Sequence, residues 1–229
     1  MMDNTTENDE VQFDEEHLCS LIHQGDTLAF REEYLSLHPY DQAQFYEKVE
    51  PDIRQVIYQY LSPKELAEIF EALELDDNGY TRFLEEMTPI YAAQMISEMY
   101  TDDAVDVLNE LDKDQISHFL KLMSNEDAQE IRELLHYEEY TAGSIMTTEY
   151  VAIPENSTVR SAMTILRNEA PNAETIYYIF VVDDAEHLAG VISLRDLIIA
   201  DEDTLIHDIM NDRVVSVKVA DDQEDVAQI

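Results

Sequence analysis

The sequence predicts an α plus α/β protein: an N-terminal all-α superhelical part, followed by smaller α/β units of the order βαββα. In the first part, short apolar stripes recur with a helical period, and each follows a residue that can cap a helix. In the second part, the run 176–182 is rich in β-branched and aromatic residues, which is typical of a buried strand. The change of period predicts a boundary near residue 136.

The first helices are indicated by apolar faces and by their end signals. Leu18 and Ile22 share one face, and Gly25 is the expected end of that helix. Asp41 is the expected cap of a later helix. The run Ser62-Pro63-Lys64-Glu65 combines a capping Ser, Pro at the first helical position and Glu at the third, which predicts a capping box.

Later helix starts follow one another at intervals of 11 to 13 residues, at Thr88, Thr101, Asp112 and Ser124. Each opens an apolar stripe about three turns long. A unit this short cannot bury its own stripe, so neighbouring units must stack on one another. This favours a superhelix, and a compact irregular helical bundle is the alternative interpretation.

The α/β part has one complete unit. We expect a strand at 151–153, a helix capped by Ser157 or Thr158, a strand at 176–182, a turn at 183–187, a strand at 188–193 and a helix at 194–200. Gly190 is expected to let the hairpin turn tightly.

Features of this unit recur about 64 residues later. Residues 206–210 echo 142–146, and an expected strand at 214–217 echoes 150–153, after which the second copy stops at Ile229. We therefore predict four segments, namely a disordered tail at 1–13, a helical domain at 14–136, a first α/β unit at 137–200 and the start of a second at 201–229.

The charge of the chain is strongly one-sided. There are 52 acidic and 13 basic residues, which gives a formal net charge of −39. Nucleic acid is excluded as a partner because its phosphates would be repelled. Three interpretations of the acidic excess stay open, namely a solvated acidic surface, a basic partner and bound cations.

Several other classes of function have little support. Cys19 is the only cysteine, so an internal disulfide is impossible and a reducing compartment fits. The first ten residues lack the apolar core of a signal peptide, and the longest apolar run is far shorter than the roughly 18 residues that suggest a membrane helix.

The chain has four glycines and no Gly-rich phosphate loop, and no Ser-His-Asp arrangement stands out, so we predict no enzyme. Glu74, Asp76, Asn78 and Glu85 match part of a calcium-loop spacing, but we interpret 76–79 as a turn between helices.

The stretch 190–196, Gly-Val-Ile-Ser-Leu-Arg-Asp, ends the first α/β unit, and Ile-Met stands near the start of each copy. This unit resembles a CBS domain. Together with the acidic helical part and the stretches 137–139, 143–147, 173–178 and 222–224, it closely resembles the cytosolic part of MgtE-type magnesium transporters, over about residues 15–229. The resemblance implies an MgtE N domain followed by CBS domains, the second one truncated. It further implies a homodimer through the CBS domains, a transmembrane pore elsewhere in the same full-length chain and a place at the cytoplasmic face of the membrane.

The same resemblance implies Mg²⁺ ligands. Asp102 and Asp106 match an aspartate pair at the family's domain interface, and their i, i+4 spacing places both on one side of a helix. Asp222 and Glu224 match further ligands, and the turn Gly143-Ser144 matches a backbone carbonyl ligand. The alternatives are a solvated first helical turn, which explains Asp106 poorly, and a helix cap for Asp222.

ATP is the second ligand that the resemblance implies. Tyr178, Ser193, Arg195 and Asp196 match positions for base stacking, ribose contact and phosphate contact. Ser193 and Asp196 are three residues apart at a helix start, so simple capping is the alternative for them, and a salt bridge is the alternative for Arg195. The leading hypothesis is a Mg²⁺-sensing gate of a magnesium transporter. The competing hypotheses are a CBS adenine-nucleotide sensor without metal gating and an acidic scaffold for basic proteins.

Overall fold

The computed structural model describes residues 13–73, 75, 79–138 and 140–229. They form two compact units. The first contains the described residues up to Met99 and Asp103–Gln129, and the second contains Tyr100–Asp102 and Glu130–Ile229. Residues 1–12 of the predicted tail and Glu74 and Asp76–Asn78 of the calcium-like spacing lie outside the described residues.

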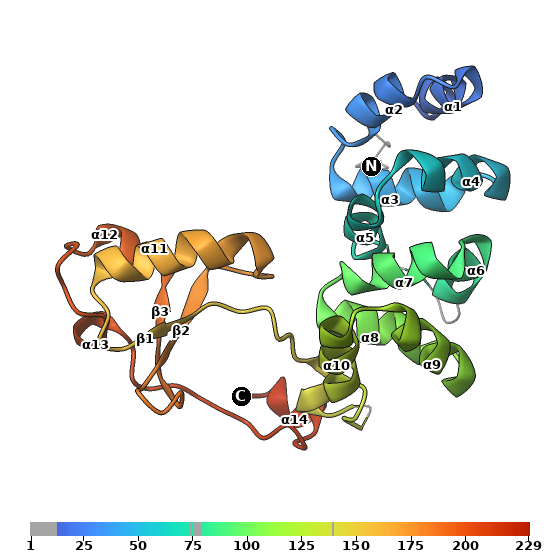
Figure 1. The fold of residues 1–229 in the computed structure, drawn as a ribbon. Helices are drawn as coiled ribbons and strands as arrows, with labels where there is room; N and C mark the ends of the chain where they lie inside the picture. The colour runs from blue at the N-terminus through green and yellow to red at the C-terminus, as the bar shows by residue number, and fades with distance from the viewer. Residues whose placement is uncertain (1–12, 74, 76–78, 139) are drawn as a thin grey trace, which may run out of the picture. The chain divides into compact units, whose positions relative to one another are not determined.

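The first part of the chain is helical (Figure 1). Its helices are α1 (Glu15–Gln24), α2 (Thr27–Tyr34), α3 (Pro39–Lys48), α4 (Pro51–Tyr60), α5 (Pro63–Phe70), α6 (Gly79–Glu86), α7 (Pro89–Ser97), α8 (Thr101–Asn109), α9 (Lys113–Leu122) and α10 (Asn125–Leu134). Helix α3 packs on α5, α5 on α7 and α7 on α9. This successive stacking confirms the predicted superhelix.

Local capping chemistry explains most of the helix starts. The capping box at Ser62 is present, a second one joins Asp112 to Gln115, and Thr88 caps α7. Gly25 ends α1 with φ of 73°, a left-handed conformation that suits glycine. The prediction that Asp41 caps a helix is wrong, because α3 begins two residues earlier at Pro39 and its cap is His38.

Aromatic side chains fill the centre of the first unit. Phe30, Tyr34, Phe45, Tyr46 and Phe70 have no exposed surface. Fully buried aromatic residues contribute most of the hydrophobic stabilisation of such a core. The inward positions predicted for Phe45 and Tyr46 are therefore confirmed.

The second unit contains a small mixed sheet. Its elements are η1 (Ala142–Ile145), β1 (Ala152–Pro154), α11 (Val159–Glu169), η2 (Ala170–Asn172), β2 (Tyr178–Val182), β3 (Leu188–Ser193), α12 (Leu194–Ile199), α13 (Ile206–Ile209) and α14 (Gln223–Val226). The strand order is β1-β2-β3, with β1 and β2 parallel and β2 and β3 antiparallel. The predicted βαββα order is confirmed, and with it the α plus α/β fold class.

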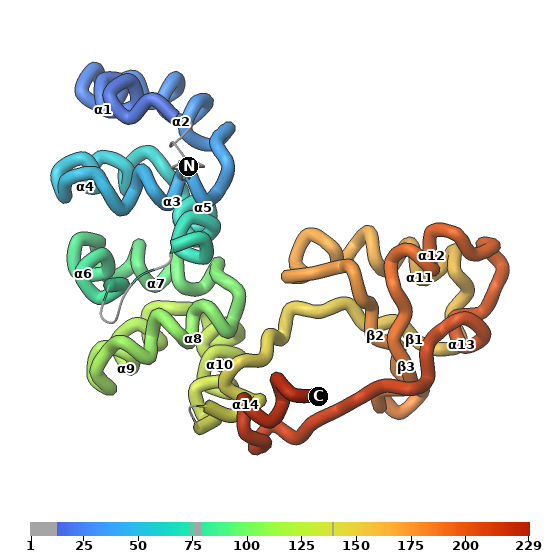
Figure 2. Tube along the Cα trace, turned by 180° about the vertical axis from the view of Figure 1, so that it is seen from behind, coloured from blue at the N-terminus to red at the C-terminus, as the bar shows by residue number. Residues whose placement is uncertain are grey.

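Two predictions about this unit are wrong. Residues 214–217 form no strand but part of the run that leads from α13 to α14 (Figure 2). A strand needs a partner, and a segment equivalent to β2, 64 residues further on, would fall beyond Ile229. Gly190 does not turn the hairpin either, because it pairs with Val181 inside β3, and the turn is made by residues 183–187.

Candidate functional site

The end of β3 and the start of α12 bring two predicted ligand residues into direct contact. Ser193 caps α12: its hydroxyl oxygen accepts a hydrogen bond from the backbone N–H of Asp196, at 3.1 Å. The same hydroxyl donates to the Asp196 carboxylate, at 2.7 Å. The capping alternative is therefore geometrically real, but both side chains also face open space.

That space consists of two cavities that share Tyr178 and Ser193. The larger, of about 660 Å³, is lined by Tyr177, Tyr178, Ser193, Leu194, Arg195, Ile198 and Ile199. The smaller, of about 420 Å³, is lined by Tyr178, Val191, Ser193, Asp196, Ile209, Met210 and Asn211. The structure thus gathers all four predicted nucleotide residues around adjoining cavities.

Two residues of the cavity lining bear on the predicted nucleotide site. Tyr178 is 63% exposed, which leaves its side chain accessible for stacking. Arg195 is exposed and, in the described part of the chain, takes part in no ion pair. The salt-bridge alternative for Arg195 therefore has no support among these residues, and its guanidinium is available to a phosphate.

One wall of the smaller cavity was not predicted from the sequence. Asn211 pairs with Val191 through two backbone hydrogen bonds, of 2.8 and 3.0 Å, and this places Met210 beside the hairpin. A Cβ atom on Gly190 would lie 2.7 Å from the Met210 sulfur and 3.0 Å from the Asn211 carbonyl oxygen. Gly190 is therefore needed for this close approach. The Gly-Val sequence itself does not show which segment approaches it.

The second group of predicted ligands also lies together. The Gly143 N–H donates to the Val219 carbonyl oxygen at 2.8 Å, and Thr141 forms a bridge with Asp222. Residues 141–144 and 219–224, far apart in the sequence, thus run side by side. Glu224 follows Asp222 in the same short segment, so Gly143, Ser144, Asp222 and Glu224 belong to one region of the second unit.

Asp222 also has the capping role that was its alternative. Its carboxylate accepts a hydrogen bond from the Glu224 N–H at 2.8 Å, at the start of α14. Ser144 likewise has a local role, because its hydroxyl donates to the Thr141 carbonyl oxygen. Metal binding at Asp222 would use carboxylate lone pairs other than the one that holds the cap.

Asp102 and Asp106 both lie in α8, and they differ in exposure. Asp102 is half-buried and Asp106 is exposed. Burial raises the pKa of Tyr80, and the nearby negative charges of Asp103, Glu110 and Asp106 raise it further. Asp106 therefore belongs to a negatively charged surface. Within the described residues, no three or more His, Cys, Asp or Glu side chains are grouped closely enough to hold a metal ion.

Glu149 contacts the start of α8, a role that was not predicted from the sequence. Its carboxylate accepts hydrogen bonds from the N–H (3.1 Å) and hydroxyl of Thr101 and from the hydroxyl of Thr147 (2.8 Å). Burial opposes ionisation of Glu149, but these hydrogen bonds prevail and lower its pKa. Thr101 is the first residue of α8, so Glu149 anchors the start of the helix that carries Asp102.

Comparisons with known proteins agree with this architecture. A family model described as the MgtE intracellular N domain matches residues 37–140, and a CBS domain model matches residues 142–203. The crystal structure of the soluble part of a magnesium transporter is 57% identical, with a TM-score of 0.90, and the match covers 93% of this chain and 84% of that one. The chain belongs to the MgtE family.

Other MgtE proteins are similar over nearly the same range. The magnesium transporter MgtE of Enterococcus faecalis is 61% identical over 199 residues, which are 87% of this chain and 44% of that protein. The MgtE of Thermus thermophilus is 37% identical over 215 residues, 93% of this chain and 47% of that protein. The chain thus spans about half the length of the curated MgtE relatives that it matches.

A second solved structure is also similar to this chain. The cytosolic domain of the Mg²⁺ channel MgtE, crystallised in complex with ATP, is 36% identical, with a TM-score of 0.82, and the match covers 93% of this chain and 87% of that one. In the described part of the present chain, none of the helices has the length and apolar character needed to span a membrane.

Proposed function

We propose that this chain is the cytosolic Mg²⁺-sensing gate of a magnesium transporter, and that it closes when Mg²⁺ binds between the acidic N domain and the CBS domains. The observation that carries the proposal is the pairing of residues 141–144 with 219–223 in a chain of net charge −39. This pairing supports a common metal region for Gly143, Ser144, Asp222 and Glu224. Membership of the MgtE family supports the transporter assignment.

The chemistry of the proposed gate is electrostatic. Two carboxylates about 4 Å apart repel each other by roughly 4 kcal/mol at an effective dielectric constant of 20. Mg²⁺ prefers oxygen ligands and keeps several of its waters, so one or two carboxylates suffice for each ion. Asp102 and Asp106 on α8 are the proposed ligands of the helical domain. Bound Mg²⁺ then favours a closed arrangement, and loss of Mg²⁺ restores the repulsion.

The proposal includes the setting of the gate. The transmembrane pore belongs to the same full-length chain, the CBS domains form a homodimer, and the gate lies at the cytoplasmic face of the membrane. The role is regulatory and not enzymatic. The names of the relatives, all magnesium transporters MgtE, support this setting.

Adenine-nucleotide binding is the second candidate, and a specific observation favours it. Tyr178 and Ser193 line both of two adjoining cavities, Arg195 lines the larger one and Asp196 the smaller one. A similar MgtE domain was crystallised with ATP. ATP binding is compatible with Mg²⁺ sensing. A pure nucleotide sensor differs from the gate because its acidic residues would serve as surface charge alone.

Small-angle X-ray scattering during a Mg²⁺ titration tests the gate. We expect the radius of gyration to decrease as the Mg²⁺ concentration rises from zero to about 20 mM. The decrease should be larger than in NaCl of matched ionic strength. The Asp102→Asn/Asp106→Asn variant should lose this extra compaction, whereas the exposed pair Asp52→Asn/Glu68→Gln should retain it. Equal responses to Mg²⁺ and to NaCl would refute Mg²⁺ gating and leave the nucleotide sensor.

A further inference from the structure

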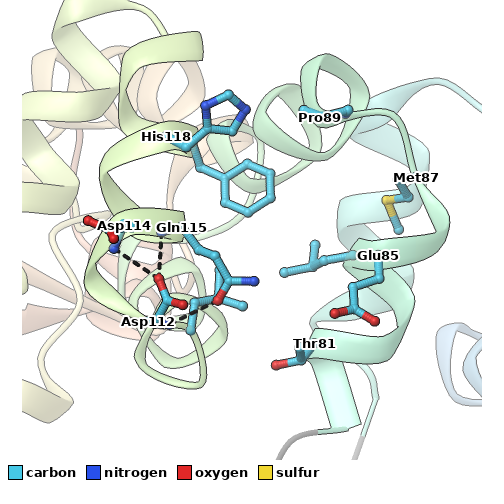
Figure 3. Close-up of a pocket in the computed structure, with 11 residues that line it drawn as sticks. Thr81, Glu85, Met87, Pro89, Asp112, Asp114, Gln115 and His118 are labelled. Atoms are coloured by element: carbon cyan, nitrogen blue, oxygen red, sulfur yellow. Dashed lines mark hydrogen bonds between the residues drawn. The ribbon is translucent and has the colours of Figure 1, made fainter.

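The helical unit has a groove whose lining contains none of the Mg²⁺ or nucleotide ligands proposed above (Figure 3). It has a volume of about 370 Å³ and lies between α6, the segment that joins α6 to α7, and α9. Its floor is apolar: Leu84, Met87, Leu111 and Phe119 line it, and each of these residues is less than 10% exposed. A cavity of this size and lining suits one large apolar side chain.

The rim of the groove is acidic. Glu85 lies on α6, and Asp112 and Asp114 lie on the opposite wall (Figure 3). Asp112 is held in place, because its carboxylate accepts hydrogen bonds from the N–H groups of Asp114 and Gln115 at 2.9 and 2.8 Å. The lining residues include no Lys or Arg. A ligand with positive charge beside its apolar group therefore complements both floor and rim.

A polar atom of the lining also lacks a partner. The Thr81 hydroxyl is buried and, among the described residues, forms no hydrogen bond. A buried hydroxyl without a hydrogen-bond partner destabilises the protein, because it has lost its water and gained nothing in exchange. A ligand that supplies a polar group to Thr81 would remove this destabilisation.

We propose that this groove docks a short peptide of a partner protein, which inserts one large apolar side chain and places flanking Lys or Arg residues against Glu85, Asp112 and Asp114. A second copy of this chain is a poor occupant, because it has only 13 Lys and Arg residues against 52 Asp and Glu residues and so offers little positive charge to the rim. A bare metal ion would leave the apolar floor unused. The apolar anchor with a charged rim corresponds to a groove-binding mode of peptide recognition.

Selection from a phage-displayed library of random 12-residue peptides on the 229-residue chain tests the proposal. We expect the enriched peptides to share an apolar residue flanked by Lys or Arg. Fluorescence anisotropy with a labelled enriched peptide should show at least ten-fold weaker binding to Glu85→Lys/Asp114→Lys. The control Glu47→Lys/Glu68→Lys changes the net charge equally on exposed positions away from the groove and should weaken binding less than two-fold.

Two further measurements locate the peptide independently of the rim charges. The methyl NMR signals of Leu84, Met87 and Leu111 should shift on peptide addition. Thr81→Val, which keeps the shape of the side chain, should preserve the fold and weaken peptide binding at least three-fold. The proposal is overturned by the absence of enriched peptides, by enrichment of acidic peptides, by equal weakening in the two charge-reversal pairs, or by methyl shifts confined to other regions.

Discussion

Ser193 and Asp196 are joined by two hydrogen bonds that run in opposite directions: the Asp196 N–H donates to the Ser193 hydroxyl, and that hydroxyl donates to the Asp196 carboxylate. The first bond starts helix α12, and the second fixes the orientation of the carboxylate. Because Asp196 also lines the smaller cavity, the helix cap places an oriented carboxylate at that cavity. Capping and ligand binding are thus compatible roles for this pair.

Asp196→Ala is expected to lower the affinity for ATP at least ten-fold, because a carboxylate acceptor for the ribose hydroxyls is lost. Asp196 is exposed, so the fold should persist, and calorimetric titration gives the affinity directly. Asp201→Ala, an exposed substitution outside both cavity linings, is the matched control. An unchanged ATP affinity in Asp196→Ala would remove Asp196 from the nucleotide site and would leave the Mg²⁺ proposal untouched.

Gly143→Ala is expected to separate residues 141–144 from 219–223. The new Cβ would lie 2.6 Å from ring atoms of Tyr137 and 3.0 Å from the Val219 carbonyl oxygen. Overpacking of this kind costs about 1–3 kcal/mol, and hydrogen exchange of the residue-143 amide should accelerate about ten-fold or more.

A second substitution makes this expectation specific. Tyr137→Ala removes the ring that the new methyl group meets. The Gly143→Ala/Tyr137→Ala double variant should therefore exchange more slowly at residue 143 than the sum of the single effects predicts. Additive effects would contradict a steric origin.

Local signals in the sequence predict much of the fold. The capping residues Ser62, Thr88 and Asp112 act on N–H groups two or three residues ahead, so their roles follow from spacing alone. Helix α4 was not predicted, although Pro51 at its first position and the buried Ile53 and Ile57 were available as signals.

The contacts that were not predicted are long-range. Glu149 anchors Thr101 across 48 residues, and Gly190 contacts the Met210–Asn211 segment. Periodicity and caps describe a residue's neighbours along the chain, whereas these roles depend on tertiary packing. The proposed nucleotide residues were indicated by a family resemblance and not by the local pattern.

Glu149→Ala is expected to loosen the start of α8. Thr101 is 4% exposed, so its N–H and hydroxyl would be left without their carboxylate acceptor and without free access to water. We expect the free energy of local opening at the start of α8 to fall by about 1–3 kcal/mol, which corresponds to roughly ten-fold or greater acceleration of hydrogen exchange at the Thr101 amide. Glu169→Ala, at an exposed position on α11, should leave that exchange rate unchanged. Equal rates in both variants would show that Glu149 does not anchor the helix.

Glu65→Gln should reduce stability at neutral pH, and the difference from the parent chain should shrink in acid. Two hydrogen bonds from the Arg31 guanidinium, at 2.5 and 2.9 Å, together with Ser62, lower the pKa of Glu65 from 4.5 to about 2. A lowered pKa in the folded state contributes stability that is complete above pH 4.5 and is lost as the pH falls towards 2.

Urea unfolding of the helical unit measures this contribution. After solvent screening, we expect Glu65→Gln to lower the free energy of unfolding by about 1–2 kcal/mol at pH 7 and by less at pH 3. Glu68→Gln, an exposed change on the same helix, corrects for the general loss of negative charge. A difference between Glu65→Gln and the parent chain that stays constant from pH 7 to pH 3 would contradict the ion pair as its cause.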